Sequence, residues 1–163
     1  MMMNYMEFNY LAELIEFYEE FIQPYNGKPN GCSDSEINYL ENYFGFQFPL
    51  AYKEYLRFMG KDNSIFIGSE VFFGNVIENT KYLPELLAEN NIDFILPDSY
   101  LVYFLHQGYV AMWFELPKKS ENPEVWFFTE SSGNEMPKII GTFTETILAD
   151  VKGRAKLYQK ING

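Results

Sequence analysis

Between Tyr100 and Thr129 the chain reads YLVYFLHQGYVAMWFELPKKSENPEVWFFT. This stretch holds runs of β-branched and aromatic residues at 100–105, 109–116 and 125–129, a composition typical of strands. The connections HQG and PKKSENPE are too short for the crossovers that parallel strands need. The runs therefore predict an antiparallel meander. Because the first two are apolar almost throughout, we expect them at the centre of the sheet, with at least one face covered by helices.

A capping-box pattern marks the first of two helices that are joined by a short turn and precede these strands. The Ser33 hydroxyl and the Glu36 carboxylate can each accept a hydrogen bond from the other's backbone amide, which starts a helix that Gly45 can end in a left-handed turn. Pro49 can occupy the first position of the next helix, because the amide hydrogen that it lacks has no partner there. Gly60 is expected to stop that helix.

The N-terminal residues 7–23 predict a further, amphipathic helix. Apolar side chains recur there at spacings of three and four, with glutamates on the far side. Pro24 and the NGKPNG stretch after it are expected to end this helix in an exposed connection. Glu13, Glu16 and Glu20 form an acidic strip on it, which is a reserve candidate for partner binding.

The remaining segments complete the predicted architecture. Residues 65–67 and 71–73 predict two short strands around a tight turn, and 84–89 predict a small helix. A final helix opens at a second capping-box pattern, Thr142 to Glu145, and Gly153 is expected to break it. Helices, then strands, then a helix predict an α+β fold with helices packed on a mostly antiparallel sheet, in a single domain over residues 1–163.

The composition limits the classes of partner. Of the 163 residues 47% are apolar and 19% aromatic, which is enough to build a substantial hydrophobic core. Lys and Arg number 12 against 23 Asp and Glu, for a net charge of −11. Such a field repels phosphate backbones, so direct nucleic-acid binding is not expected, and it attracts a basic partner instead.

The sequence predicts a cytoplasmic protein. The single cysteine, Cys32, cannot close an intramolecular disulfide, and the Asn-x-Ser/Thr acceptor pattern for glycosylation does not occur. The N-terminus has neither the basic flank nor the unbroken apolar stretch of a signal peptide. Apolar runs also fall short of the roughly 20 residues that cross a bilayer, so no membrane segment is expected.

No motif in the sequence predicts a catalytic, metal or cofactor site. The chain has one His and one Cys, far apart, and the run Asp62-Asn63-Ser64 continues into apolar residues where a calcium loop needs oxygen ligands. His106 reads as a turn or core histidine, with a catalytic base as the alternative. Cys32 precedes a helix start that could lower its thiol pKa, yet no base is evident beside it. Phosphate-binding glycine motifs are absent, and the tryptophans Trp113 and Trp126 are expected in the core.

The segment SDSEINYLENYFGFQFPLAYKEYLRFMG, from Ser33 to Gly60, resembles the opening signature of the SUKH superfamily in its yeast cell-wall-regulator-like (Smi/Knr) branch. A later segment also resembles the family. The matching positions are Ile37, Glu41, Gly45, Pro49, Tyr52, Tyr55 and Leu56, and then Ile139, Ile140, Thr142, Phe143, Ile147 and Leu148. The resemblance covers about residues 33–151 and leaves 1–27 as an extra N-terminal helix. One departure follows Met59, where many members have an Asn-Gly-Gly-like turn and this chain has Gly-Lys-Asp-Asn.

The resemblance implies an α+β fold without a shared set of catalytic residues. It also implies, for bacterial members, frequent service as immunity proteins that bind and neutralise a toxin, often a nuclease. Our leading hypothesis is therefore a non-catalytic, acidic binding protein, without a cofactor, that occludes a basic toxin domain. Predicted turns and strand ends supply the candidate contacts, namely Asp62, Asn63, Glu70, Glu115, Glu121 and Glu124.

Two alternatives stay open at this stage. The first is a regulatory interaction scaffold of the Smi/Knr type with no toxin partner. The second is an enzyme of unrecognised type, which predicts a concave pocket that contains a strongly shifted titratable group.

Overall fold

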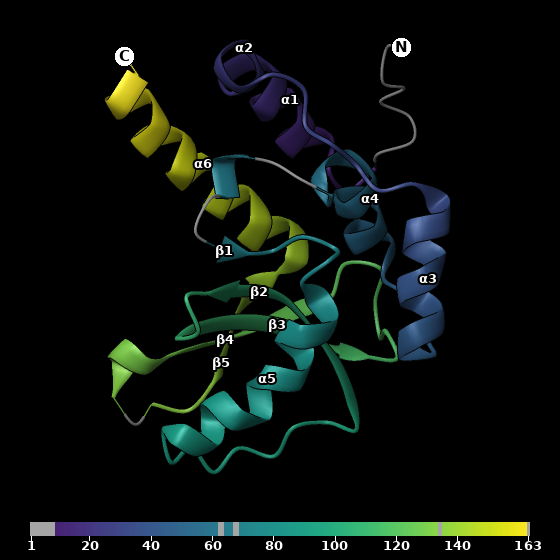
Figure 1. Cartoon of the computed structure of the whole chain (residues 1–163), viewed down its shortest axis with the longest axis vertical. Coiled ribbons are helices and arrows are strands. Elements are labelled where there is room, and N and C mark those ends of the chain that lie inside the picture. The colour runs from purple at the N-terminus through teal and green to yellow at the C-terminus, as the bar shows by residue number, and fades with distance from the viewer. Residues whose placement is uncertain (1–8, 62–63, 67–68, 134, 163) are drawn as a thin grey trace.

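The computed structural model of the chain describes residues 9–61, 64–66, 69–133 and 135–162. Within these residues the strands form one antiparallel sheet in the order β1-β2-β3-β4-β5 (Figure 1). Helices packed on this sheet make a single-domain α+β fold, which confirms the predicted fold class. The strands are β1 Ser69–Glu70, β2 Ser99–His106, β3 Val110–Leu116, β4 Glu124–Thr129 and β5 Lys138–Thr142. The helices are α1 Ala12–Phe21, α2 Gln23–Asn26, α3 Asp34–Phe44, α4 Leu50–Met59, α5 Val76–Glu89 and α6 Phe143–Asn162.

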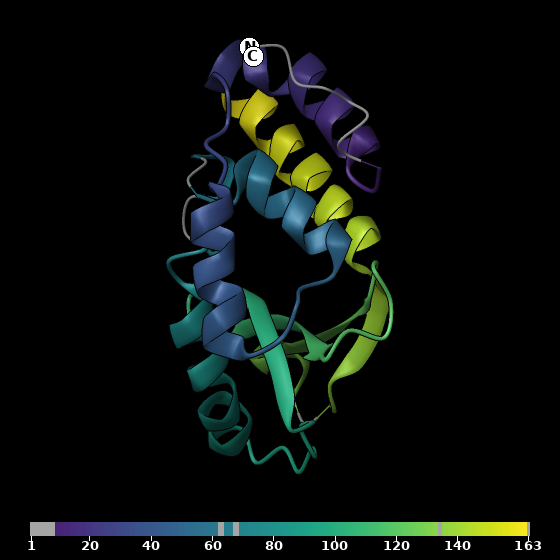
Figure 2. The same ribbon diagram turned by 90° about the vertical axis from the view of Figure 1, so that its right-hand side faces the viewer.

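The sheet separates two apolar layers. On one face, side chains such as Leu101 and Phe114 join the large core formed with α1, α3, α4 and α6. On the other face, Val102 and Trp113 pack with Leu83 and its neighbours on α5. Figures 1 and 2 show α5 on the opposite side of the sheet from α4 and α6. Because the central strands are buried on both faces, their sequences are apolar almost throughout.

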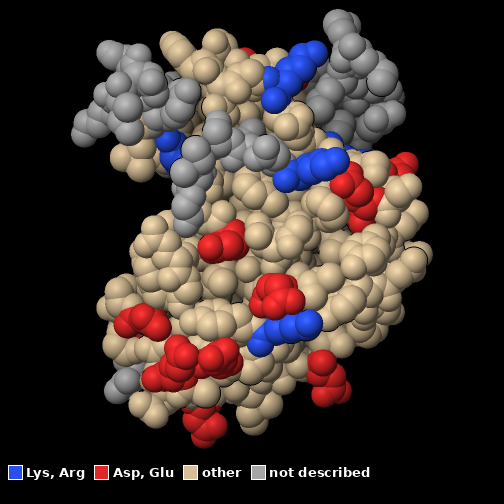
Figure 3. Space-filling view, in the orientation of Figure 1, with Lys and Arg blue, Asp and Glu red and all other residues tan. Residues whose placement is uncertain are grey.

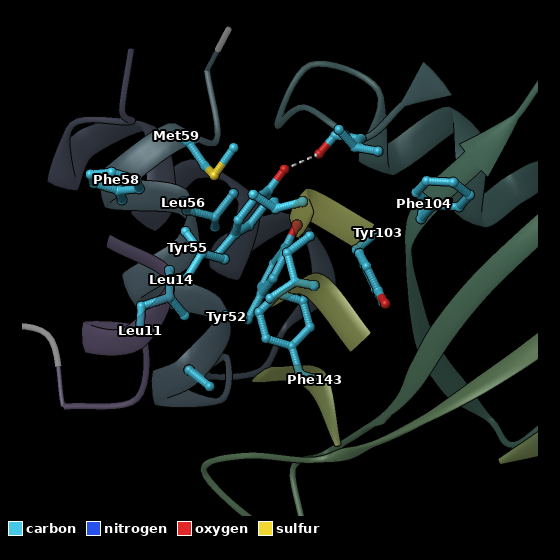
Figure 4. Packing of buried hydrophobic residues seen from close by; sticks show 14 of the residues in the cluster. Leu11, Leu14, Tyr52, Tyr55, Leu56, Phe58, Met59, Tyr103, Phe104 and Phe143 are labelled. Carbon is cyan, nitrogen blue, oxygen red and sulfur yellow. Dashed lines mark hydrogen bonds between the residues drawn. The ribbon is translucent and has the colours of Figure 1, made fainter. Parts of the chain in front are cut away.

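Tyr52 of α4 lies in the middle of the larger core (Figure 4). Its ring centroid is 5.2 Å from that of Phe114 on β3 and 5.6 Å from that of Phe143 on α6. The rings of Phe48 and Tyr103 lie 5.5 Å and 6.5 Å away. Edge-to-face contacts of this kind add to the free energy gained by burial. One side chain thus joins α4, α6 and the sheet.

Both predicted capping boxes are present. The Ser33 amide donates to the Glu36 carboxylate at 2.9 Å, and the Glu36 amide donates to the Ser33 hydroxyl at 3.2 Å. The Thr142 amide likewise donates to the Glu145 carboxylate at 3.1 Å, and the return bond measures 3.4 Å. Gly45 ends α3 at φ 79°, in the left-handed region that glycine adopts without a steric cost. These local signals fix where α3 and α6 begin and where α3 ends.

The predicted strands at 65–67 and 71–73 are wrong. Ser64–Phe66 forms a short 3-10 turn, and the strand is β1, within the segment expected to turn. Positions 67 and 68 lie outside the described residues. This irregular segment buries three side chains in the large core, those of Ile65, Phe66 and Val71. Its sequence is apolar because these side chains are buried, and an apolar run of this length resembles a strand.

Two helices extend further than their sequences predict. Helix α5 begins at Val76 and contains Pro84 in its interior, where a proline normally marks a boundary. Helix α6 continues through Gly153 to Asn162, and Ala155 beyond the glycine is 2% exposed. In both cases tertiary packing outweighs the local helix-breaking preference.

Smaller differences concern helix boundaries. Helix α1 runs from Ala12 to Phe21. Pro24, which was expected to end that helix and begin an exposed connection, lies inside the short helix α2. Pro49 is the capping residue of α4, one position before the first helical residue that we expected it to be. The proposed start of the first helix at residue 7 lies outside the described residues.

Strand β5 was not predicted from the sequence. Its pairing with β4 shifts register between Val125 and Trp126, so the strand is irregular. It forms an edge of the sheet, where Ile139 and Ile140 stay 44% and 42% exposed. With only five residues and Gly141 near its end, β5 lacks the length and alternation that identify a strand.

Two neighbouring tyrosines provide a matched test of this core. The Tyr55 hydroxyl donates to the Val71 carbonyl at 2.9 Å, whereas the buried Tyr52 hydroxyl has no partner in the part of the chain that the structure describes. We expect Tyr55→Phe to lower the free energy of unfolding by about 1–2 kcal/mol, because it leaves a buried carbonyl unpaired. Tyr52→Phe should leave that free energy unchanged or raise it by up to about 1 kcal/mol. Urea unfolding measures both, and equal losses would contradict the prediction.

Candidate functional site

A concavity of about 530 Å³ lies where β3 ends and β4 begins. We call it the sheet-end concavity. Trp126 on β4 and Ile139 on β5 form its apolar part, and Glu115 and Glu124 contribute carboxylates. Residues of the connection between β3 and β4 complete its wall, among them Lys119 and Asn122.

Two carboxylates line this concavity, one from each of the two central strands that border it. The pairing of β3 with β4 runs from Val110 opposite Thr129 to Trp113 opposite Trp126. Glu115 and Glu124 each lie two residues beyond that last pair, and both line the concavity. The concavity therefore carries two carboxylates beside its apolar part.

Few cations offset this negative charge. The Lys119 ammonium lies 3.3 Å from the Glu115 carboxylate, but the Lys119 side chain is 86% exposed, and exposed pairs of this kind contribute little. Glu124 is exposed and has no ion pair within the described residues. The carboxylate of Glu121, in the connection, pairs with Lys118. Negative charge therefore stays uncompensated at Glu124.

Hydrogen bonds from α4 and α6 hold the connection between β3 and β4 in place. The Ala51 amide donates to the Glu121 carbonyl at 2.9 Å, and the Phe143 amide donates to the Pro123 carbonyl at 2.8 Å. The Asn122 side chain also exchanges two hydrogen bonds with Thr144, of 2.8 Å and 3.1 Å. The first turns of α4 and α6 thus fix the wall of the sheet-end concavity.

The structure brings some of the nominated contacts together and separates others. Glu115, Glu121 and Glu124 lie at this one end of the sheet, whereas Glu70 lies on β1 at the other edge, opposite Leu105. Asp62 and Asn63 lie outside the described residues. The reserve candidates Glu13, Glu16 and Glu20 are exposed on α1, and Glu13 lies 3.8 Å from Lys152 of α6.

Trp126 and Ile139 were not nominated from the sequence. Trp113 is buried as predicted, whereas Trp126, which was also expected in the core, is only partly buried. The ring of Phe94 contacts it at 5.2 Å between centroids. Trp126 and Ile139 pair across β4 and β5, so they could have been nominated only if β5 had been predicted.

A second polar cluster lies inside the molecule, on the α6 side of the sheet. The Arg154 guanidinium donates to the Ser69 hydroxyl at 2.7 Å and contacts the Asp150 carboxylate at 3.3 Å. It also lies over the rings of Phe66 and Phe104, at 5.0 Å and 5.9 Å from their centroids. The guanidinium is therefore held by both charge and aromatic contacts.

This cluster contains a serine, a histidine and an aspartate, but their geometry differs from that of a catalytic triad. An arginine only donates, so the Ser69 hydroxyl accepts from Arg154, and it shares a 2.7 Å hydrogen bond with His106 Nδ1 whose direction depends on the histidine tautomer. Asp150 bonds Arg154, and the described residues show no hydrogen bond from it to His106. Ser69 is only 9% exposed. The cluster connects β1, β2 and α6, which is a structural role for His106.

Cys32 is buried, and its environment disfavours the thiolate. Desolvation is the main cause, and nearby Glu36 adds to it, so that the pKa of the Cys32 thiol is raised to about 12. The helix start, which could have lowered this pKa, does not outweigh the loss of solvent. The thiol is a core side chain.

The described residues contain neither a metal-binding cluster nor a helix that could span a membrane. No group of three or more His, Cys, Asp or Glu side chains in the described ranges is placed to hold a metal ion. None of the helices in the described part of the chain is long and apolar enough to cross a bilayer.

Comparison with known families places the chain. The model of the SMI1/KNR4 family (SUKH-1) matches residues 31–149, and the protein therefore belongs to this family. Members of the family are generally non-catalytic, and the family is associated with protein–protein interaction. A comparison with individual curated proteins gave no match. The matched range contains every residue named above for the sheet-end concavity.

The Cys32 assignment predicts very slow thiol chemistry. At pH 8 a thiol with a pKa of about 12 carries about a thousandfold less thiolate than an ordinary cysteine. We expect Ellman's reagent to label the native protein at least that much more slowly than the same protein in 6 M guanidinium, where about one thiol per chain reacts at once. Rapid labelling of the native state would contradict the burial of Cys32.

Replacing Arg154 should lower the stability of the fold by an amount that depends on pH. Burial raises the pKa of Asp150, although the Arg154 charge opposes that rise. Arg154→Met keeps the apolar stem but removes the opposing charge, so the pKa of Asp150 rises further in the folded state. The variant should lose about 2–4 kcal/mol at pH 7, because a partly buried carboxylate is left unpaired.

The sign of the pH effect follows from the raised pKa. Below the folded pKa of Asp150 the folded state holds a proton that the unfolded state releases, so lowering the pH stabilises the fold. The stability gap between Arg154→Met and the wild type should therefore narrow as the pH falls from 7 toward about 4. Adding Asp150→Asn should restore part of the stability at pH 7 and remove that pH dependence, as measured by urea unfolding. A gap that is constant with pH would contradict this assignment.

Proposed function

We propose that this protein is an immunity-type binding protein that neutralises a cognate toxin inside the cell by covering its active surface. The observation that carries the proposal is the sheet-end concavity, a preformed hollow with an apolar part and the unpaired carboxylate of Glu124 in a family of interaction proteins. Its action needs no bond to be made or broken. Occlusion and charge are sufficient.

The charge of the protein favours a basic partner. The net charge of −11 steers cationic surfaces toward it and raises association rates at low ionic strength. Figure 3 shows one face on which acidic side chains gather over the lower half, while most of the visible basic side chains lie above them. A nuclease is a fitting target, because a site that attracts phosphate also attracts carboxylates.

A rigid wall favours tight binding. The connection between β3 and β4 is tied to α4 and α6 by backbone and side-chain hydrogen bonds, so little ordering is needed when a partner docks. Apolar surface at Trp126 and Ile139 supplies contact area beside the charges, and tryptophan is prominent among residues that dominate interface energies.

The family description also supports a second candidate function. In that alternative the same surface binds a regulatory partner, as a Smi/Knr-type scaffold, and no toxin is involved. The extra N-terminal helix, which we propose lies outside the family-like core of residues 33–151, would be available to either role. The two functions differ in the neighbouring gene and in the phenotype, and both use the same surface.

A co-expression experiment tests the proposed function. We expect the protein to restore growth to cells that express the toxic product of the adjacent gene, and to co-purify with that product. The double variant Glu115→Lys/Glu124→Lys should slow association by about tenfold at low salt, with a smaller effect at high salt. Surface plasmon resonance at two salt concentrations measures the effect.

A matched control is available on α5. Glu85 and Glu89 are exposed and lie toward the opposite end of the sheet, since Tyr82 bonds the Gly108 carbonyl and Asn90 bonds Glu130. Glu85→Lys/Glu89→Lys changes the net charge by the same amount and should slow association far less. Absence of both growth rescue and binding would overturn the immunity role, whereas binding without toxicity would favour the regulatory scaffold.

A further inference from the structure

The sheet-end concavity has the features of a binding slot for one particular side chain. Its apolar part is the partly buried Trp126, whose ring is held by an edge-to-face contact with Phe94 at 60° between planes. Ile139 continues this surface and is 44% exposed. Ligand sites typically combine such apolar walls with a few placed polar groups.

The carboxylates specify the charge of the occupant. Glu115 and Glu124 both line the concavity, so an occupant there meets two carboxylates. Among the described residues, Lys119 pairs with Glu115, and its side chain is mostly exposed to solvent. An incoming cation would replace that weak pair and neutralise Glu124.

Arginine fits this combination better than other cations do. A guanidinium is planar, stacks on aromatic rings and donates to two carboxylates at once, whereas a lysine ammonium is a compact and strongly hydrated charge. Calcium requires six to eight oxygen ligands, and the Asn122 amide is already occupied by Thr144. A second copy of this chain is disfavoured, because each copy carries a net charge of −11.

We propose that the sheet-end concavity is an arginine slot, in which one arginine of a basic protein partner stacks on Trp126 between Glu115 and Glu124. This inference rests on the proposed function, because it names the chemical group by which the partner is recognised. The guanidinium displaces the Lys119 ammonium from Glu115, and the aliphatic stem of the arginine lies along Ile139. The slot is formed before the partner arrives, since α4 and α6 hold its wall.

The two tryptophans of the chain make a direct test possible without the partner. Each gives one indole N–H signal in an NMR spectrum, and Trp113 is fully buried whereas Trp126 lines the slot. The full-length protein is titrated with N-acetyl-arginine methylamide, and Trp126→Phe assigns the signal. We expect the Trp126 signal to shift with a dissociation constant on the order of 1–10 mM, while the Trp113 signal stays in place and reports an intact fold.

Two comparisons test the choice of arginine. The citrulline analogue has the same shape without the charge and should not shift the Trp126 signal. The lysine analogue keeps the charge without the planar donor group, and it should bind about threefold or more weakly. A shift as large with lysine as with arginine would overturn the arginine assignment, and no shift with arginine would overturn the slot.

Paired variants test the carboxylates. Glu115→Gln/Glu124→Gln should weaken arginine binding about tenfold or more, and Glu85→Gln/Glu89→Gln, with the same change of net charge, should weaken it less than twofold. Equal weakening in both would show that only general electrostatics is involved and would overturn the proposal.

The slot and the proposed function can fail separately. Growth rescue by a wild-type protein that does not bind arginine would leave the proposed function intact. Arginine binding without rescue or toxin binding would reject the immunity function and leave the slot.

Discussion

The edge-to-face packing of aromatic rings around Tyr52 is the contact on which the rest of the structure depends. The rings come from α4, β2, β3 and α6, so none of these elements can shift without opening a gap in the core. The same place anchors the surface. Phe143 contributes its ring to the cluster and its amide to the Pro123 carbonyl, while Ala51, next to Tyr52, holds the Glu121 carbonyl. The core therefore fixes the connection that walls the sheet-end concavity.

The Arg154 cluster and the sheet-end concavity differ in whether their charges are paired within the protein. Arg154 is enclosed by Asp150, Ser69 and aromatic rings, and its charge and donors are met from within the protein. Glu124 is left without an ion pair among the described residues, and it lines the same concavity as Glu115. A charge that is satisfied internally stabilises the fold, whereas a charge left open costs some stability and is available to a partner. This contrast is the physical reason why we propose a partner-binding role for the sheet end and a structural role for Arg154.

Local chemistry explains which features could be predicted. The Ser33–Glu36 and Thr142–Glu145 capping boxes involve residues three apart, so the sequence shows both partners of each bond. The central strands are long and strongly apolar, and their composition alone identifies them. Strand β5 and the full length of α5 were missed, because a five-residue irregular edge and an internal Pro84 contradict the local rules that packing overrides. The raised pKa of Cys32 was not predicted for a related reason, since the burial that raises it depends on distant parts of the chain.

The amino-acid sequence alone is enough to establish the α+β class, the antiparallel meander, the helix starts at Ser33 and Thr142, and the acidic balance. Each of these depends on composition or on residues close together along the chain. Only the tertiary structure decides which of the 23 acidic residues act together. Glu115 and Glu124 line one concavity, and Trp126 pairs with Ile139, because strand pairing brings distant parts of the chain together, and a register shift of one residue would turn each side chain to the other face.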